Sequence, residues 1–179
     1  ADESAQFLKT MMAAGAMTDR QAANMAGVVA NLAEAGKVAP RKVLADMAKS
    51  SKEINLFFRG NVKAAAAAAV QLARMGSSLE KSSKMAEGLL NWDTSIDAEM
   101  EASVMLNRHM DLSQARFKAF QGDLAGATEV VLNQVGKLSD FNKLNVLQKQ
   151  AVAKAAGLEV DELANMLKQR EAIRDLSVE

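Results

Sequence analysis

Glycine and proline constrain this chain most, because they mark where regular structure has to stop. The 179 residues include ten glycines and one proline. Glycine ends helices readily, since it adopts the left-handed conformation without steric cost. Seven glycines each follow a helix-favouring stretch: Gly15, Gly36, Gly60, Gly76, Gly122, Gly136 and Gly157. This spacing predicts an all-α fold of about ten short to medium helices, Gly-terminated and packed as antiparallel helical hairpins.

Composition agrees with a helical fold. Hydrophobic residues make up 49% of the chain and aromatic residues only 4%, and Ala, Leu and Met, which favour helices, supply most of the apolar content. A β-rich fold of this length would need more β-branched and aromatic residues. The expected helices span residues 4–14, 18–35, 39–49, 51–58, 61–75, 78–91, 94–108, 112–121, 123–135, 139–156 and 159–175.

Local signals predict where helices begin and which side chains form the core. Capping boxes are predicted at Ser50–Glu53 and Ser77–Glu80, N-caps at Thr18, Asp111 and Ser139, and Pro40 in a first helical turn. One apolar face comprises Leu124, Ala127, Val131 and Val135, and a second comprises Leu144, Leu147, Ala151, Ala155 and Leu158. The bulky side chains expected to anchor the core are Trp92, Phe57, Phe58, Phe117, Phe120 and Phe141.

The length fits one all-helical domain over residues 1–179, with a possible subdivision into 1–76 and 77–179. The first residue is Ala1, not Met, and the chain ends abruptly at Glu179, so it reads as a fragment of a longer protein or a processed chain. Asn31–Gly36 and Gln71–Gly76 resemble each other 40 residues apart. They indicate either a true repeat or the shared chemistry of helix ends.

Charge and cysteine content exclude several classes of function. Basic and acidic residues number 22 each, so no net field favours nucleic acid or an anionic membrane. The basic cluster Arg41, Lys42, Lys49 and Lys52 has no aromatic residue among it and is interpreted as a solvated face. Without cysteine there is no disulfide framework and no thiolate metal site. The longest apolar run, Ala64–Val70, is far shorter than the roughly 20 residues of a membrane anchor.

Residues able to support catalysis are scarce, and no catalytic site, cofactor site or metal site is predicted. His109 is the only histidine, and Cys and Tyr are absent. His109 with Asp111 suits a solvated turn and an N-cap better than a metal site, which needs three or four ligands. The carboxylates Asp93, Asp97, Glu99 and Glu101 suggest a cation patch, but the helix macrodipole explains acids near a helix start. The loop Gly122–Gly126 lacks the Lys-Ser/Thr of a phosphate-binding loop.

The alanine-rich stretch is the candidate contact surface. Small side chains allow close approach between helices, so the helix predicted over residues 61–75 suits either a tightly packed central position or self-association between chains. The residues of the possible interface are Ala64, Ala65, Ala66, Ala67, Ala68, Ala69 and Val70.

Four stretches carry a resemblance to a known family. They are Met75–Leu106, Met110–Arg116, Gln121–Gly126 and Phe141–Leu167. In order and spacing they resemble segments of tail tape-measure proteins, or related tail structural proteins, of large marine bacteriophages. The resemblance implies a helical, non-enzymatic piece of a protein that sets tail length. The chain departs from that family because it has no long uninterrupted heptad stretch. A compact domain is therefore expected in place of a rod.

Two functions follow from these observations. The first is a structural role in phage tail assembly and length determination, with tail proteins or further copies of the chain as partners, a possible homo-oligomer, and a location in the virion. The alternative is a cytoplasmic helical adaptor or scaffold domain that binds a partner helix in an apolar groove. A metal enzyme that uses Asp93, Asp97 and His109 is the least favoured function.

Overall fold

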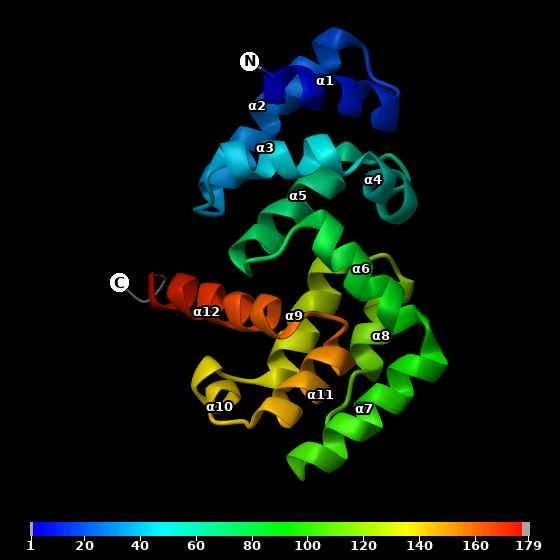
Figure 1. Ribbon diagram of the computed structural model, residues 1–179. Helices are drawn as coiled ribbons and strands as arrows, with labels where there is room; N and C mark the ends of the chain where they lie inside the picture. Colours follow the sequence, from blue (N-terminus) through cyan, green and yellow to red (C-terminus); the bar gives the residue numbers. More distant parts are fainter. Residues whose placement is uncertain (1, 177–179) are drawn as a thin grey trace. The chain divides into compact units, whose positions relative to one another are not determined.

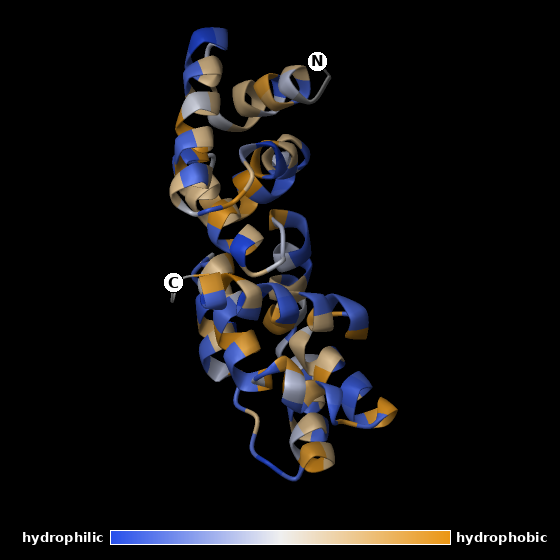
Figure 2. Cartoon of the chain, turned by 90° about the vertical axis from the view of Figure 1, so that its left-hand side faces the viewer, coloured by the Kyte–Doolittle hydropathy of each residue, from blue (hydrophilic) through white to orange (hydrophobic). Residues whose placement is uncertain are grey.

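The computed structural model describes residues 2–176, with side chains from residue 4 onward. Helices connected by turns make up the described chain, which contains no strand (Figure 1). The all-α prediction is therefore confirmed. Figure 2 shows hydrophobic and hydrophilic residues alternating along the helices, the pattern of helices that bury one face.

The chain divides into two compact units, Ala1–Lys81 and Ser82–Glu179. The boundary falls inside one helix, α6, five residues beyond the boundary expected at residue 76. Unit 1 contains α1 (Asp2–Gly15), α2 (Asp19–Ala35), α3 (Pro40–Lys49), α4 (Ser51–Phe58) and α5 (Val62–Arg74), followed by the start of α6 (Leu79–Leu90). In unit 1, α3 packs against α1, α2 and α5.

Unit 2 continues from α6 through six further helices. They are α7 (Trp92–Leu106), α8 (Ser113–Phe120), α9 (Leu124–Val135), α10 (Leu138–Asn142), α11 (Val146–Ala156) and α12 (Val160–Leu176). α7 packs most extensively on α11, and α8 packs on α9. The predicted core face Leu124, Ala127, Val131 and Val135 is buried, as expected from its period.

Several predicted helix starts are confirmed and others are wrong. Thr18 caps α2 in a capping box with Gln21, and Pro40 is the first residue of α3. Ser50 occupies the N-cap position of α4 but makes no side-chain capping bond, because its hydroxyl donates to the carbonyl oxygen of Asp46 at 2.6 Å. Ser139 lies inside α10, which begins one residue earlier.

The predicted helix over residues 139–156 is two helices separated by a turn. Asn145 caps the second, α11: its side chain accepts from the Gln148 amide at 2.9 Å, and the Gln148 side chain accepts from the Asn145 amide at 3.0 Å. Asparagine competes for backbone groups in this way and stops the preceding helix. Leu147, predicted in the core, consequently lies in the exposed first turn of α11.

Substituting Asn145 with alanine is expected to lower the free energy of unfolding by about 1 kcal/mol, since the Gln148 amide in the first turn of α11 loses its acceptor. Urea denaturation followed by circular dichroism measures this loss. Asn142→Ala, an exposed residue at the end of α10, is the control. Equal stability of the Asn145→Ala variant and wild type would show that the capping box contributes nothing.

The two similar segments near Gly36 and Gly76 end their helices with different residues. The amide of Val38 donates to Ala33 and that of Ser77 to Leu72, the same bond that closes many helix ends. The left-handed residue is Lys37 in the first segment and Gly76 in the second. Because the register differs by one position, the shared chemistry of helix ends accounts for the similarity better than a repeat does.

A half-buried carboxyl group links α3 to the start of α6 within unit 1. Asp46 accepts from the Leu79 amide, at 3.0 and 3.2 Å to its two oxygens. The Ser50 hydroxyl lies 3.3 Å from one of these oxygens. Burial raises the pKa of Asp46 to about 6, although the bonds from Leu79 and Ser50 favour the ionised form. Asp46 therefore supplies an acceptor for α6, yet its charge is costly in this environment.

Candidate functional site

The outer face of α7 carries an exposed ridge of large apolar side chains. Trp92, Ile96, Met100 and Val104 recur at intervals of four residues, which places them along one slowly turning line of the helix surface. Their exposed fractions run from 39% for Ile96 to 80% for Val104. The opposite face, with Ser95, Ala98 and Ala102, is buried. The small residues of α7 thus face the core, and the large ones face solvent.

Two phenylalanines of α8 extend this ridge. Phe117 is 55% exposed and Phe120 is 74% exposed, while Ala115 and Ala119 are buried. The Leu112 amide donates a hydrogen bond to Glu99, and the Arg116 side chain donates one to Ser95. Because the later residue of α8 meets the earlier residue of α7, the two helices run antiparallel there. The six residues Trp92, Ile96, Met100, Val104, Phe117 and Phe120 are called the apolar surface below.

A buried ion pair holds the two helices of the apolar surface together. Arg116 Nη1 lies 2.6 Å from Glu99 Oε2 and donates to Ser95 Oγ at 3.1 Å. Glu99 Oε2 also accepts from the Leu112 amide at 3.1 Å, just before α8 begins. The side chains of Arg116 and Glu99 are only 10% and 13% exposed. The pair therefore joins the first half of α8 to the middle of α7.

The aromatic residues were predicted to anchor the core, and for three of them this is wrong. Trp92, Phe117 and Phe120 are exposed, whereas Phe141 is 2% exposed and forms part of the core as predicted. Phe57 and Phe58 are partly buried. The spacing of Trp92, Ile96, Met100 and Val104 is readable from the sequence as one face of a helix. A face of that kind is ordinarily buried, so the sequence alone does not distinguish it from a core face.

Carboxylates border the ridge on α7. Asp93, Asp97 and Glu101 each follow a ridge residue directly, and they form a second line parallel to it, the acidic row. Glu101 pairs with Lys154 of α11 at 3.1 Å, with both side chains largely exposed. Asp93 and Asp97 are exposed, and α7 contains no lysine or arginine. The apolar surface therefore has a negatively charged edge.

The carboxylates considered as a cation patch do not converge. Glu99 pairs with Arg116, Glu101 pairs with Lys154, and Asp93 and Asp97 lie on the acidic row. Within the described part of the chain, no three His, Asp or Glu side chains are grouped so that they could hold a metal ion.

His109 and Asp111 lie in the turn between α7 and α8. His109 is exposed and lines an open depression with Ser103, Val104, Asn107 and Arg108. Asp111 accepts from the Ser113 amide at 2.9 Å and from its hydroxyl at 2.6 Å. These bonds lower the pKa of Asp111. Asp111 therefore acts as a turn-forming residue beside α8, although Leu112 occupies the N-cap position.

The alanine-rich stretch lies largely in the core of unit 1. Ala65, Ala66, Ala69 and Val70 are buried in α5, which packs on α2, α3 and α4. Ala64 and Ala67 are exposed and Ala68 is partly buried, so these three leave only a narrow surface for another chain. Self-association through α5 stays a prediction, restricted to that surface.

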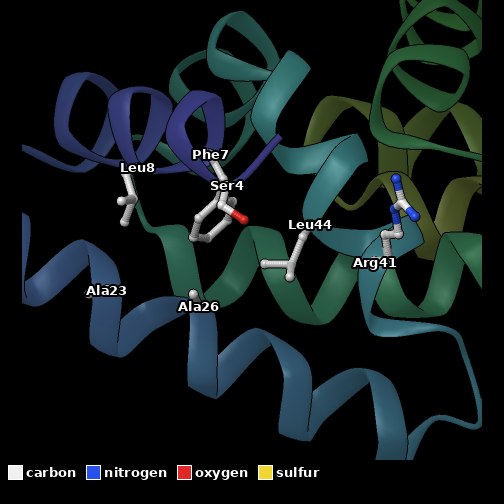
Figure 3. Close-up of a pocket in the computed structure, with 7 residues that line it drawn as sticks. All are labelled: Ser4, Phe7, Leu8, Ala23, Ala26, Arg41 and Leu44. Atoms are coloured by element: carbon white, nitrogen blue, oxygen red, sulfur yellow. The ribbon is translucent and has the colours of Figure 1, made fainter. Parts of the chain in front are cut away.

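Unit 1 contains a cavity of about 340 Å³ between α1, α2 and α3 (Figure 3). Its lining residues are Ser4, Phe7, Leu8, Ala23, Ala26, Arg41 and Leu44. Ser4 and Arg41 are the polar residues of this lining, and the other five are apolar. Arg41 is exposed, as are Lys42, Lys49 and Lys52 of the basic cluster. The cavity therefore offers a mostly apolar surface among the described residues.

Comparison with known proteins does not assign this chain to a family. No family model, curated protein or solved structure matches it. In the described residues, no helix combines the length and the apolar character needed to cross a membrane. The candidate function therefore rests on the chemistry of the apolar surface alone.

Proposed function

We propose that this chain is a non-enzymatic interaction module that binds another protein chain through the apolar surface of unit 2. The proposal is supported by six large hydrophobic side chains exposed on two adjacent helices. Together they expose on the order of several hundred Å², the size of patch that marks interaction sites on monomers. Aromatic residues and methionine are also the types enriched at protein interfaces.

The polar groups beside the apolar surface support a binding role over a catalytic one. Glu99 and Arg116 join α7 to α8, Glu101 pairs with Lys154 on α11, and Asp111 orders a turn. Each of these side chains has a structural partner, which accounts for its presence without substrate chemistry.

Phage tail assembly stays a prediction that follows from the resemblance. The longest helices, α2 and α12, have 17 residues each, which corresponds to roughly 25 Å of helix. Helices of this length suit a compact domain of a tail protein more than a tape-measure rod. In either setting, an adaptor or a tail component, the apolar surface would bind a neighbouring chain.

Selection from a displayed library of amphipathic helical peptides tests the proposal. Wild-type protein is expected to enrich peptides that a Trp92→Ser/Phe120→Ser variant does not retain, because the variant loses the two largest exposed rings. The control is Leu56→Ser, since Leu56 of unit 1 is 58% exposed against 59% for Trp92. The control should retain the selected peptides. Peptides that bind all three proteins equally, or no enriched peptide at all, would contradict the proposal.

A further inference from the structure

Resting on the proposed function, the structure also indicates the chemistry of the partner. We infer that the apolar surface binds an amphipathic helix whose own apolar ridge is bordered by lysine or arginine. The inference combines the geometry of the ridge with the charge of the acidic row beside it. The two features run parallel on α7, one residue apart at every turn.

The ridge geometry favours a helix as the partner. Residues at intervals of four form the ridges that pack into grooves of the same kind on another helix. Helices packed in this way cross at about −50°, so only two to three turns of each are in contact. Trp92, Ile96 and Met100 span two turns of α7 and are all exposed. An apolar ridge of similar length on a partner would cover these three residues.

The charge of the acidic row selects a basic partner. Asp93 lies in the first turn of α7, where the helix dipole accounts for an acid. Asp97 lies one turn further on, where the dipole no longer has an effect, and it stays exposed. Glu101 pairs only with an exposed lysine, and such pairs exchange partners at little cost. A partner with lysines beside its ridge would pair with all three carboxylates.

A second copy of this chain and an anionic membrane fit the acidic row less well. In a second copy, α7 would add the same carboxylates and no lysine or arginine. The lysine of α8, Lys118, already lies 3.5 Å from Asp123. An anionic membrane would meet Asp93 and Asp97 as like charges. Attraction between the acidic row and a basic helix would also raise the rate of association at low salt.

Trp92 is the only tryptophan, so its fluorescence reports directly on the apolar surface. The probes are three helical peptides with the same leucine ridge, bordered by lysine, glutamine or glutamate. The lysine peptide is expected to shift Trp92 emission to shorter wavelength and to bind about tenfold more tightly than the glutamate peptide at low salt. In an Asp93→Asn/Asp97→Asn variant, and at high salt, this preference should shrink.

The outcomes separate the inference from the proposed function. Equal affinity for all three peptides, abolished by Phe120→Ser, would overturn the basic partner and leave the interaction surface intact. If none of the peptides shifts the Trp92 emission, both the basic partner and the proposed function are overturned. A shift that appears on raising the protein concentration alone, with a doubled mass by light scattering, would assign the surface to a second copy and overturn the inference. A shift of Trp92 emission with phosphatidylcholine vesicles, but with none of the three peptides, would also overturn the inference.

Discussion

Replacing Glu99 with alanine is expected to lower the free energy of unfolding of unit 2 by about 3 kcal/mol. The substitution leaves Arg116 in a largely buried position with only Ser95 as a side-chain partner, and it removes the acceptor of the Leu112 amide. Removing one member of a buried ion pair is costly, because the remaining charge stays desolvated without compensation. Chemical denaturation followed by circular dichroism measures the loss.

Glu101→Ala is the matched control for Glu99→Ala, since it removes a carboxylate from the same helix. Its pair with Lys154 is exposed, so a loss below about 1 kcal/mol is expected. A double variant, Glu99→Leu/Arg116→Met, should recover part of the loss by replacing the pair with apolar contacts. Equal losses for Glu99→Ala and Glu101→Ala would show that burial of the pair contributes nothing.

The Glu99 variant also connects stability with binding. Glu99 and Arg116 set the register of α8 on α7, and α8 carries Phe117 and Phe120 of the apolar surface. Glu99→Ala protein that stays folded is therefore expected to bind the lysine-bordered peptide more weakly, even though neither residue belongs to the apolar surface. Undiminished binding would show that the surface does not depend on this register.

Stability is expected to fall as the pH rises from about 4 to about 6, by up to about 3 kcal/mol, because of Asp46. Burial raises the pKa of Asp46 from 3.8 to about 6 in the folded chain. Between these values the unfolded chain has released the proton and the folded chain retains it, so folding takes up a proton. The stabilisation from Asp46 is fully present below pH 4 and is lost as the pH rises through 6.

The measurement for Asp46 is the difference in unfolding free energy between wild type and Asp46→Asn at a series of pH values. Asparagine keeps an acceptor for the Leu79 amide and cannot ionise. Relative to wild type, the variant should therefore gain stability between pH 4 and pH 6. Asp19→Asn, which alters an exposed carboxyl on α2, is the control. A difference between wild type and Asp46→Asn that does not change with pH would show that the Asp46 carboxyl keeps its ordinary pKa.

Most helices were predictable because their signals are local. The helix over residues 51–58 was predicted with its observed bounds, and Thr18 and Pro40 mark helix starts in sequence as in structure. The failures were local as well. Asn145 and Gln148 form a capping box where the apolar period predicts one continuous helix, so α10 and α11 are separate. The left-handed residues Lys37, Arg59 and Asn107 follow helices without being glycine, so the glycine pattern does not predict them.

The candidate site was not predictable in the same way. Phe141 and Phe120 are the same residue type and both lie near the end of a helix, yet Phe141 is buried and Phe120 is 74% exposed. The difference depends on whether another helix covers that face, which is a property of residues distant in the sequence. The alanine-rich stretch, chosen as a contact surface for its composition, lies mostly in the core of unit 1 for the same reason.

The sequence by itself determined the helical class, the approximate positions of the helices and the absence of a recognisable catalytic motif. These properties follow from backbone propensity, glycine and proline, and the residue types available. Tertiary structure alone decided which apolar faces are buried, which carboxylates are paired, and that Asp46 of α3 accepts from an amide 33 residues further along the chain. Burial and desolvation depend on neighbours that only the folded chain brings together, and the apolar surface on α7 and α8 is defined by the absence of such a neighbour among the described residues.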